Sequence, residues 1–179
     1  MTTYISLLRG INVSGKNTVK MDVLKQLATK LNFVQAQTYI QSGNLLFRSE
    51  ETDTTKLSLQ LQQAIHTELG LLVPVLTLAV STFQNLIDQC PITLEEEQAQ
   101  LYVTFFGSFP KRQDSSDIFE KLSPKERLIL CDSVAYLVAG NGYGNTKITN
   151  AFLEKKLQIT ATTRNYKTCK KLVELARNL

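Results

Sequence analysis

The sequence is poor in the residues that build metal sites, disulfide frameworks and histidine-dependent catalysis. His66 is the only histidine among 179 residues, and no Gly-x-Ser-x-Gly elbow occurs, so neither a Cys/His metal cluster nor a serine–histidine triad is predicted. The three cysteines are odd in number and form no Cys-x-x-Cys pair. Cys90 and Cys169 lie on apolar helical stripes and are expected in the core. The sequence therefore predicts no metal, no cofactor and a reducing, cytoplasmic compartment.

Long apolar segments are also missing. No apolar run reaches the ~18 residues that a membrane-spanning helix needs. The first residues lack a basic region and a small-residue cleavage site, so they are not expected to form a signal peptide. We therefore predict a cytoplasmic protein without a membrane partner. The hydrophobic content of 43% is enough for a core, and the length fits one domain or two small ones.

Charge is distributed unevenly along the chain. Residues 1–50 carry six Lys/Arg against two acids, residues 51–146 carry six against twelve, and residues 147–179 carry eight against two. The acids therefore lie away from the basic ends, and no acid–base pair for catalysis stands out. Because the basic ends also contain the unusual polar motifs, the pattern favours an anionic partner.

Hydrophobic periodicity predicts the same order of elements twice. The first half is expected to contain strands over 4–8, 34–40, 45–48 and 72–78, with helices over 21–31, 57–69 and 83–90. The second half is expected to contain strands over 101–106, 127–131, 134–138 and 159–163, with helices over 114–122, after residue 146 and over 169–176. The fold class predicted is α+β, with two ferredoxin-like βαββαβ subdomains in tandem and mainly antiparallel sheets. The expected boundaries are 1–92 and 98–179.

This order has a geometric consequence for the loops. In the first half, the loop after the first strand and the turn between the second and third strands belong to one end of the sheet. Residues 9–17 should therefore lie near residues 41–44. By the same argument, residues 140–147 should lie near residues 162–168. We expect these edges to face a common groove between the two halves.

The loop after the first strand contains the most informative motif. Residues 10–16 fit Gly-x-x-x-x-Gly-Lys, the phosphate-binding loop pattern, but Asn17 stands where Ser or Thr would hold Mg²⁺. The motif indicates an anion cradle and argues against nucleotide hydrolysis. The alternative is a polar connection ordered by the side chains of Asn12 and Asn17. Asp132 follows an apolar strand, as the acidic residue of a P-loop hydrolase does. A hairpin turn formed with Ser133 explains this aspartate better.

Two further polar stretches lie in the second half. Residues 140–147, Gly-Asn-Gly-Tyr-Gly-Asn-Thr-Lys, are expected to run straight into a helix, where free N–H groups and Lys147 would suit a phosphate. The alternative is a flexible hairpin exit capped by Asn145 or Thr146. Residues 162–168 precede the last helix, with Asn165 or Thr163 as its expected cap. Arg164 could bind a phosphate or a carboxylate, or pair with a structural acid.

At these residues the chain resembles the bacterial domain-of-unknown-function family numbered 1697. The similar stretches are 7–13 with 15–17, 20–21, Leu24, 38–44, Phe47, Gly144, 146–147, 161–168 and Leu172. Ser14 replaces a family glycine, and Tyr166 stands where Trp is common. The resemblance implies a compact α+β protein with ferredoxin-like parts, and it implies no activity and no catalytic residue.

Three functional hypotheses follow. The first is a cytoplasmic protein that binds a phosphate-bearing ligand, a nucleotide or a nucleic acid, in a basic groove between the subdomains. The second is an enzyme acting on a small phosphorylated or carboxylated molecule. The third is a structural or protein-interaction role, with no particular protein partner indicated. The residues predicted to contact a ligand are Arg9, Asn12, Lys16, Asn17, Gln41, Ser42, Asn44, Lys147, Arg164 and Asn165.

Overall fold

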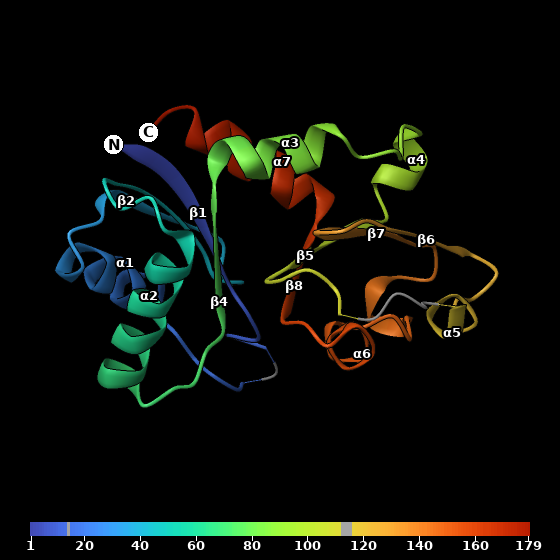
Figure 1. Ribbon diagram of the computed structural model, residues 1–179, viewed down its shortest axis with the longest axis horizontal. Helices are drawn as coiled ribbons and strands as arrows, with labels where there is room; N and C mark the ends of the chain where they lie inside the picture. The colour runs from blue at the N-terminus through green and yellow to red at the C-terminus, as the bar shows by residue number, and fades with distance from the viewer. Residues whose placement is uncertain (14, 112–115) are drawn as a thin grey trace. The chain divides into compact units, whose positions relative to one another are not determined.

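The structure is a computed structural model that describes residues 1–13, 15–111 and 116–179. The chain forms two separately packed units (Figure 1). Unit 1 comprises Met1–Asn85 together with Lys171–Leu179, and unit 2 comprises Leu86–Lys170. Ser14 and Asp114, the first residue of a predicted helix, lie outside the described residues. The domain boundaries 1–92 and 98–179 stay a prediction.

Unit 1 contains the predicted strand–helix–strand–strand–helix–strand order. Its elements are β1 (Thr2–Leu8), α1 (Met21–Lys30), β2 (Val34–Tyr39), β3 (Asn44–Ser49), α2 (Thr54–Leu69) and β4 (Val75–Ala79), followed by α3 (Val80–Asp88). The strands pair antiparallel in the order β2-β3-β1-β4. The fold class, α+β with antiparallel sheets, is confirmed in this unit.

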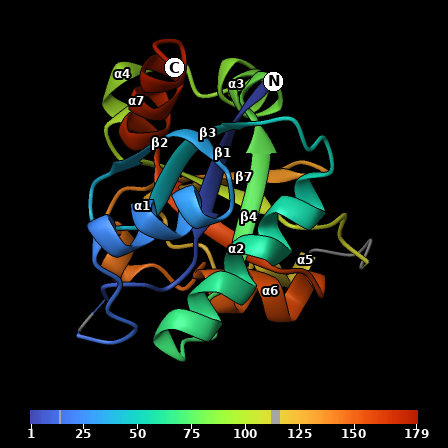
Figure 2. The same ribbon diagram turned by 90° about the vertical axis from the view of Figure 1, so that its left-hand side faces the viewer.

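Helices α1 and α2 cover one face of this sheet (Figure 2). Every second residue of a strand points to the same face, so Tyr4 and Leu8 of β1 meet the apolar stripes of the two helices. The rings of Phe33 and Phe47 stack in this core with centroids 4.0 Å apart. Burying such side chains stabilises the unit by roughly 1.5–3 kcal/mol for each one fully removed from water.

Helix α2 begins three residues before the predicted range 57–69 and ends at the predicted residue, and it also protects the edge of the sheet. Asp53 caps its start by accepting from the N–H groups of Thr55 and Lys56, and Gly70 ends it in a left-handed conformation. Along the edge strand β4, the N–H of Thr77 donates to Ser58 Oγ of α2 at 3.0 Å. The helix thus satisfies backbone donors that an open edge would offer to other chains.

Unit 2 repeats the arrangement with shorter helices. Its elements are α4 (Glu95–Gln98), β5 (Leu101–Phe106), α5 (Ser116–Phe119), β6 (Glu126–Leu130), β7 (Val134–Ala139), the 3₁₀ turn η1 (Tyr143–Asn145), α6 (Asn150–Leu157), β8 (Ala161–Asn165) and the start of α7 (Tyr166–Ala176). The strands pair antiparallel in the order β6-β7-β5-β8. The predicted hairpin around Asp132 and Ser133 is confirmed.

The core of unit 2 lies between this sheet and α6. Phe106, Ala135 and Leu137 of the sheet pack with Leu153 and Leu157 of α6. On β8 the N–H of Ala161 donates to Glu154 Oε1 of α6 at 2.9 Å. As in unit 1, a helix side chain therefore satisfies a donor on an edge strand.

The structure corrects the predicted start of α6. The glycine-rich stretch does not run straight into the helix, because the 3₁₀ turn η1 and four further residues precede Asn150. The cap is Thr149, whose Oγ1 accepts from the N–H of Phe152, rather than Asn145 or Thr146. Thr146 Oγ1 instead accepts from the N–H of Ile148 at 3.0 Å. A hydroxyl or amide in a turn can cap several neighbouring donors, and the sequence does not select among them.

The three cysteines are free thiols with different exposure. Cys131 is exposed, Cys90 is half-buried, and Cys169 is fully buried on α7. Burial raises the pKa of Cys169 from 9.0 to about 12, with the nearby charge of Arg164 acting in the opposite direction. We expect a short treatment of the native protein with iodoacetamide at pH 8 to label Cys131 first and to leave Cys169 unlabelled until urea unfolds the chain. Peptide mass spectrometry identifies the labelled thiol, and early labelling of Cys169 would contradict the assigned burial.

The same burial predicts a pH dependence of stability. Because the folded-state pKa of Cys169 is raised, this thiol contributes stability below pH 9 that is lost as pH rises towards about 12. Cys169→Ala should therefore flatten the fall in unfolding free energy between pH 9 and pH 11. Cys131→Ala is the comparison, and because partial burial raises the pKa of this more exposed thiol as well, it should flatten the fall less than Cys169→Ala does.

Candidate functional site

The loop after β1 and the turn between β2 and β3 meet at one end of the unit 1 sheet. The N–H of Leu8 donates to the carbonyl of Gly43 at 2.8 Å. Asn12 Nδ2 donates to the carbonyl of Gln41 at 2.8 Å. The predicted proximity of these two segments is therefore confirmed. We call residues 9–13, 15–20 and 40–44 the loop–turn cluster.

Asn12 holds the loop and the turn together. Both hydrogens of its amide are used, one on Gln41 O and one on Val19 O at 2.9 Å. Its Oδ1 accepts from the N–H of Val19 at 2.9 Å. The side chain thus replaces the pairing that a short strand would provide, and it positions the loop rather than reaching outward.

Two other asparagines act in the same way. Asn17 Nδ2 donates to Gly10 O at 3.1 Å and so links the two ends of the segment between residues 10 and 17. Asn44 is fully buried at the start of β3, and its Nδ2 donates to Tyr39 O at 2.9 Å and to Ser42 Oγ at 3.1 Å. The asparagines that the sequence predicts as ligand contacts therefore serve the backbone of the cluster.

Left-handed backbone conformations are concentrated in this cluster. Its residues with positive φ are Gly10, Asn12, Gly15, Asn17, Ile40 and Gly43. Asparagine and glycine tolerate this region, whereas a β-branched residue such as Ile40 is strained there by about 1–3 kcal/mol. Strained residues of this kind persist where the surroundings fix the backbone, and they gather at ligand-binding sites and switches.

The loop does not have the arrangement of a nucleotide-hydrolysing P-loop. In such a loop the backbone N–H groups face the phosphates and a helix begins at the Lys–Ser/Thr pair. Here the N–H of Lys16 donates to Val13 O at 3.0 Å and that of Asn12 donates to Asn17 O at 3.2 Å. Helix α1 begins only at Met21. The anion cradle predicted from the Gly-x-x-x-x-Gly-Lys pattern would therefore have to use side chains.

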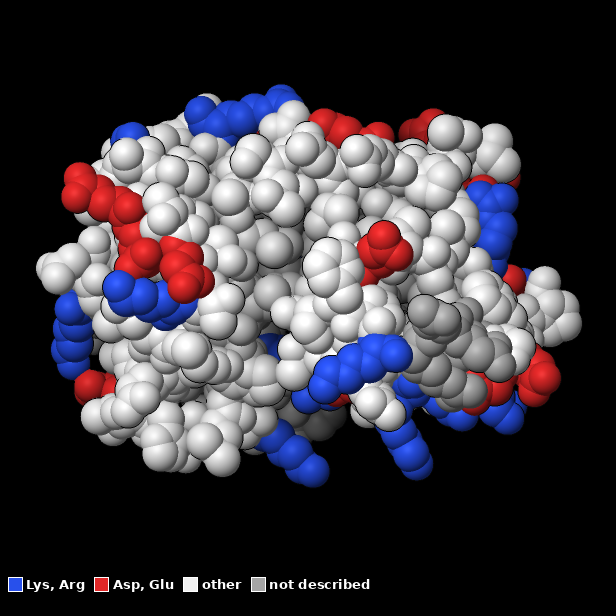
Figure 3. All heavy atoms as spheres, in the orientation of Figure 1, with Lys and Arg blue, Asp and Glu red and all other residues white. Residues whose placement is uncertain are grey.

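The loop of this cluster carries only positive charges. Residues 9–20 contain Arg9, Lys16 and Lys20 and no acid, and both lysines are exposed. Charges of both signs occur elsewhere: on the face drawn in Figure 3, separate groups of Lys or Arg and of Asp or Glu lie among mostly uncharged residues. The electrostatic signal on that face is thus a set of local sites rather than a broad basic surface.

The predicted site residues of unit 2 lie at one end of its own sheet. The ring of Tyr143 stacks on Tyr102 with centroids 4.5 Å apart, and Tyr102 pairs with Asn165 of β8. Residues 140–147 and the exit of β8 are therefore close together, as predicted. Lys147 is exposed, and Asn165 caps α7 by accepting from the N–H of Lys167 at 2.9 Å.

Arg164 differs from the other predicted contacts because it is buried. Only 8% of its surface is exposed, and its NH1 donates to Thr162 Oγ1 at 3.0 Å and to Thr163 O at 2.9 Å. Burial lowers the pKa of its guanidinium to about 10. These bonds tie Arg164 to its own strand.

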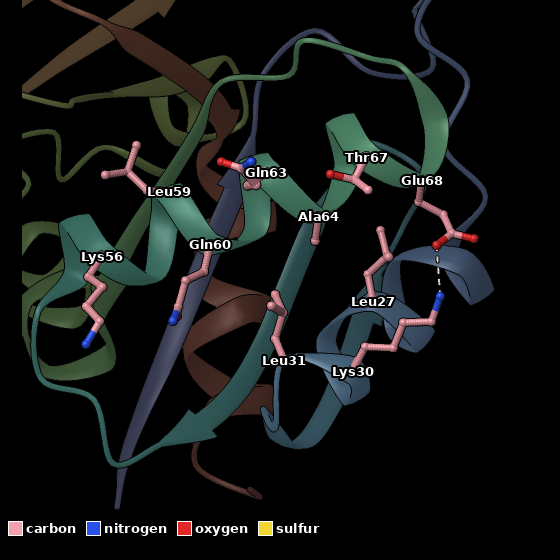
Figure 4. Close-up of a pocket in the computed structure, with 10 residues that line it drawn as sticks. All are labelled: Leu27, Lys30, Leu31, Lys56, Leu59, Gln60, Gln63, Ala64, Thr67 and Glu68. Carbon is pink, nitrogen blue, oxygen red and sulfur yellow. Dashed lines mark hydrogen bonds and ion pairs between the residues drawn. The ribbon is translucent and has the colours of Figure 1, made fainter.

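Sequence patterns did not identify a hollow of about 520 Å³ between α1 and α2. Figure 4 shows Leu27 of α1 and Leu31, the residue after α1, on one side and Ala64 of α2 on the other. At one end Lys30 Nζ pairs with Glu68 Oε2 at 2.8 Å. The other lysine of its lining, Lys56, pairs with Glu51. The residue that could have indicated this hollow is Leu59, a leucine of α2 that the structure shows to be exposed.

Residues 1–13, 15–111 and 116–179 contain no group of three or more His, Cys, Asp or Glu side chains placed to hold a metal ion. Within the same ranges, no helix combines the length and the apolar character that a membrane span requires.

Comparison with known proteins gives a family and a fold. The family described as "Protein of unknown function (DUF1697)" matches residues 1–136, which include the loop–turn cluster. Among curated proteins, none matches the chain. A solved structure titled as that of the conserved bacterial protein SP0830 from Streptococcus pneumoniae is similar, with 24% identity, 98% of each chain covered and a TM-score of 0.73. That likeness shows the shared fold, and the family match shows that the chain belongs to the DUF1697 family of proteins of unknown function.

Proposed function

We propose that the loop–turn cluster of unit 1 binds an anionic ligand that carries phosphate. The observation that carries the proposal is the exposed Lys16 on a loop that the side chains of Asn12 and Asn17 hold in shape. Arg9 and Lys20 add positive charge, and residues 9–20 contain no acid to oppose it. Lysine binds phosphate as a point charge and needs no bidentate geometry.

The hydrogen bonds within the cluster support this function. A loop that its own hydrogen bonds hold in shape loses less conformational entropy when a ligand binds, so more of the interaction energy appears as affinity. In this proposal Lys16, Arg9, Gln41 and Ser42 contact the ligand. Asn12 and Asn17 hold the loop, and Asn44 holds the turn. Lys147, Arg164 and Asn165 belong to unit 2, and their contact with a ligand stays a prediction.

A nucleotide and a nucleic acid differ in how salt affects their binding. Three basic side chains contacting a single strand would give a slope of log affinity against log salt of about −2. Binding of a short single-stranded RNA should therefore weaken strongly between 50 and 200 mM salt. A salt-insensitive interaction with RNA would exclude the nucleic-acid version of this function.

Calorimetric titration with pyrophosphate, ATP and a twelve-nucleotide RNA tests the proposal. The titrations are made without Mg²⁺, because Asn17 removes the hydroxyl that would hold the metal. Loss of a charge-assisted contact costs about 1.5–3 kcal/mol, so Lys16→Ala should weaken binding by roughly 10- to 100-fold. The control Lys25→Ala removes an exposed lysine of α1 and should bind as wild type does.

The structural hypothesis predicts a different outcome. Asparagine side chains bonded to backbone groups are also what a purely structural connection would contain. If no anion binds to the wild type, and Asn12 variants only lose stability, the cluster serves to hold the strand ends of unit 1 and the binding function is excluded.

A further inference from the structure

Two exposed aliphatic side chains lie in the loop–turn cluster beside its basic residues. Val13 is 60% exposed and Ile40 is 47% exposed. Val13 follows Asn12 in the chain and Ile40 precedes Gln41. Asn12 Nδ2 donates a hydrogen bond to Gln41 O. The backbone positions of Val13, Ile40 and Lys16 therefore lie close together, since Lys16 N–H also donates to Val13 O.

Ile40 is the more informative of the two. Among the described residues with positive φ, the others that are not glycine are asparagine or glutamine, and Ile40 alone is β-branched, at φ +51°. Asparagine would adopt this conformation with less strain. Burial does not explain the isoleucine, because about half of its surface is in water. The position thus carries an apolar side chain at the expense of backbone strain.

An inorganic anion gains nothing from exposed aliphatic groups, whereas a ligand with an apolar face next to its phosphate does. Small-molecule sites combine apolar contact area with a few polar groups that fix orientation. Nucleobases have such a face and are held between apolar side chains in many enzymes. Resting on the binding function proposed above, we infer that the ligand is a free nucleoside phosphate, with its base against Ile40 and Val13 and its phosphates at Lys16.

The test compares ATP with tripolyphosphate, which has the same phosphate chain and no nucleoside. Wild type should bind ATP more tightly than tripolyphosphate. Ile40→Asn should raise the melting temperature, weaken ATP binding about 3- to 10-fold and leave tripolyphosphate binding unchanged. The control is Gln35→Asn on β2, which replaces another left-handed residue of unit 1, at φ +54°. It should leave binding of both ligands unchanged.

Each contrary result has a defined meaning. If wild type binds neither ligand and no RNA, the proposed function fails and this inference with it. If wild type binds both ligands equally, or Ile40→Asn binds ATP as tightly as wild type, the inference is overturned and anion binding stands. An equal loss of both ligands also overturns it, because the side chain would then act only on loop shape. Binding of RNA without ATP overturns it in favour of a nucleic acid.

Discussion

Gly43→Ala should lower the free energy of unfolding by about 2–5 kcal/mol, the sum of a left-handed backbone penalty and an overpacking penalty. Gly43 lies in the β2–β3 turn at φ +80°. A Cβ placed there would be 2.7 Å from Ile11 Cδ1 and 2.8 Å from Leu8 Cβ. Both neighbours are buried, so neither can move without disturbing the core.

Gly10→Ala separates the two penalties. Gly10 also has a left-handed backbone, at φ +68°, but a Cβ there would meet nothing within 4 Å. This variant should lose only the backbone term, about 1–2 kcal/mol. Urea unfolding followed by circular dichroism measures both variants. Equal losses for Gly43→Ala and Gly10→Ala would show that the contact between the turn and the loop is not as close as described.

Asn12→Ala should have the second largest effect, a loss of about 1.5–4.5 kcal/mol for three hydrogen bonds at roughly 0.5–1.5 kcal/mol each. The variant removes the link from the loop to Gln41 O and both bonds to Val19. It also places alanine at φ +55°, where asparagine is better tolerated.

Asn12→Gly provides the matched comparison. Glycine accepts the left-handed backbone, so the difference between the two variants measures conformational strain and the remaining loss measures the side-chain bonds. Both variants should also bind the ligand less tightly, because the Asn12 side chain holds the ends of the loop that carries Lys16. In contrast, Lys16→Ala should lose affinity at unchanged stability. Asn12→Gly with wild-type stability would contradict the role assigned to this side chain.

The regular elements could be predicted from the sequence because they depend on local patterns. The apolar stripe of α1, the Asp53 cap and the Gly70 end of α2 follow from residue type and spacing alone. The proximity of the β1 loop to the β2–β3 turn followed from strand order, since antiparallel pairing fixes which loops belong to one end of a sheet.

The roles of the polar residues could not be predicted in the same way. An asparagine in a loop suits a ligand contact, a cap or a backbone link equally well, and the partners of Asn12 and Asn44 are known only once the turn is placed. Arg164 was expected to be available to a ligand. Arg164 is buried because it lies on the buried face of β8. Apolar residues usually mark the buried face of a strand, and a charged residue such as arginine does not.

The location of the bound ligand decides whether the loop–turn cluster is the binding site. Amide chemical shifts of ¹⁵N-labelled wild-type protein, followed while ATP is added, report which residues the ligand approaches. We expect saturable shifts confined to residues 9–13, 15–20 and 40–44 of unit 1, and their loss in Lys16→Ala. Shifts centred elsewhere, for example on residues 140–147 or on the hollow between α1 and α2, or no shifts at all, would contradict it.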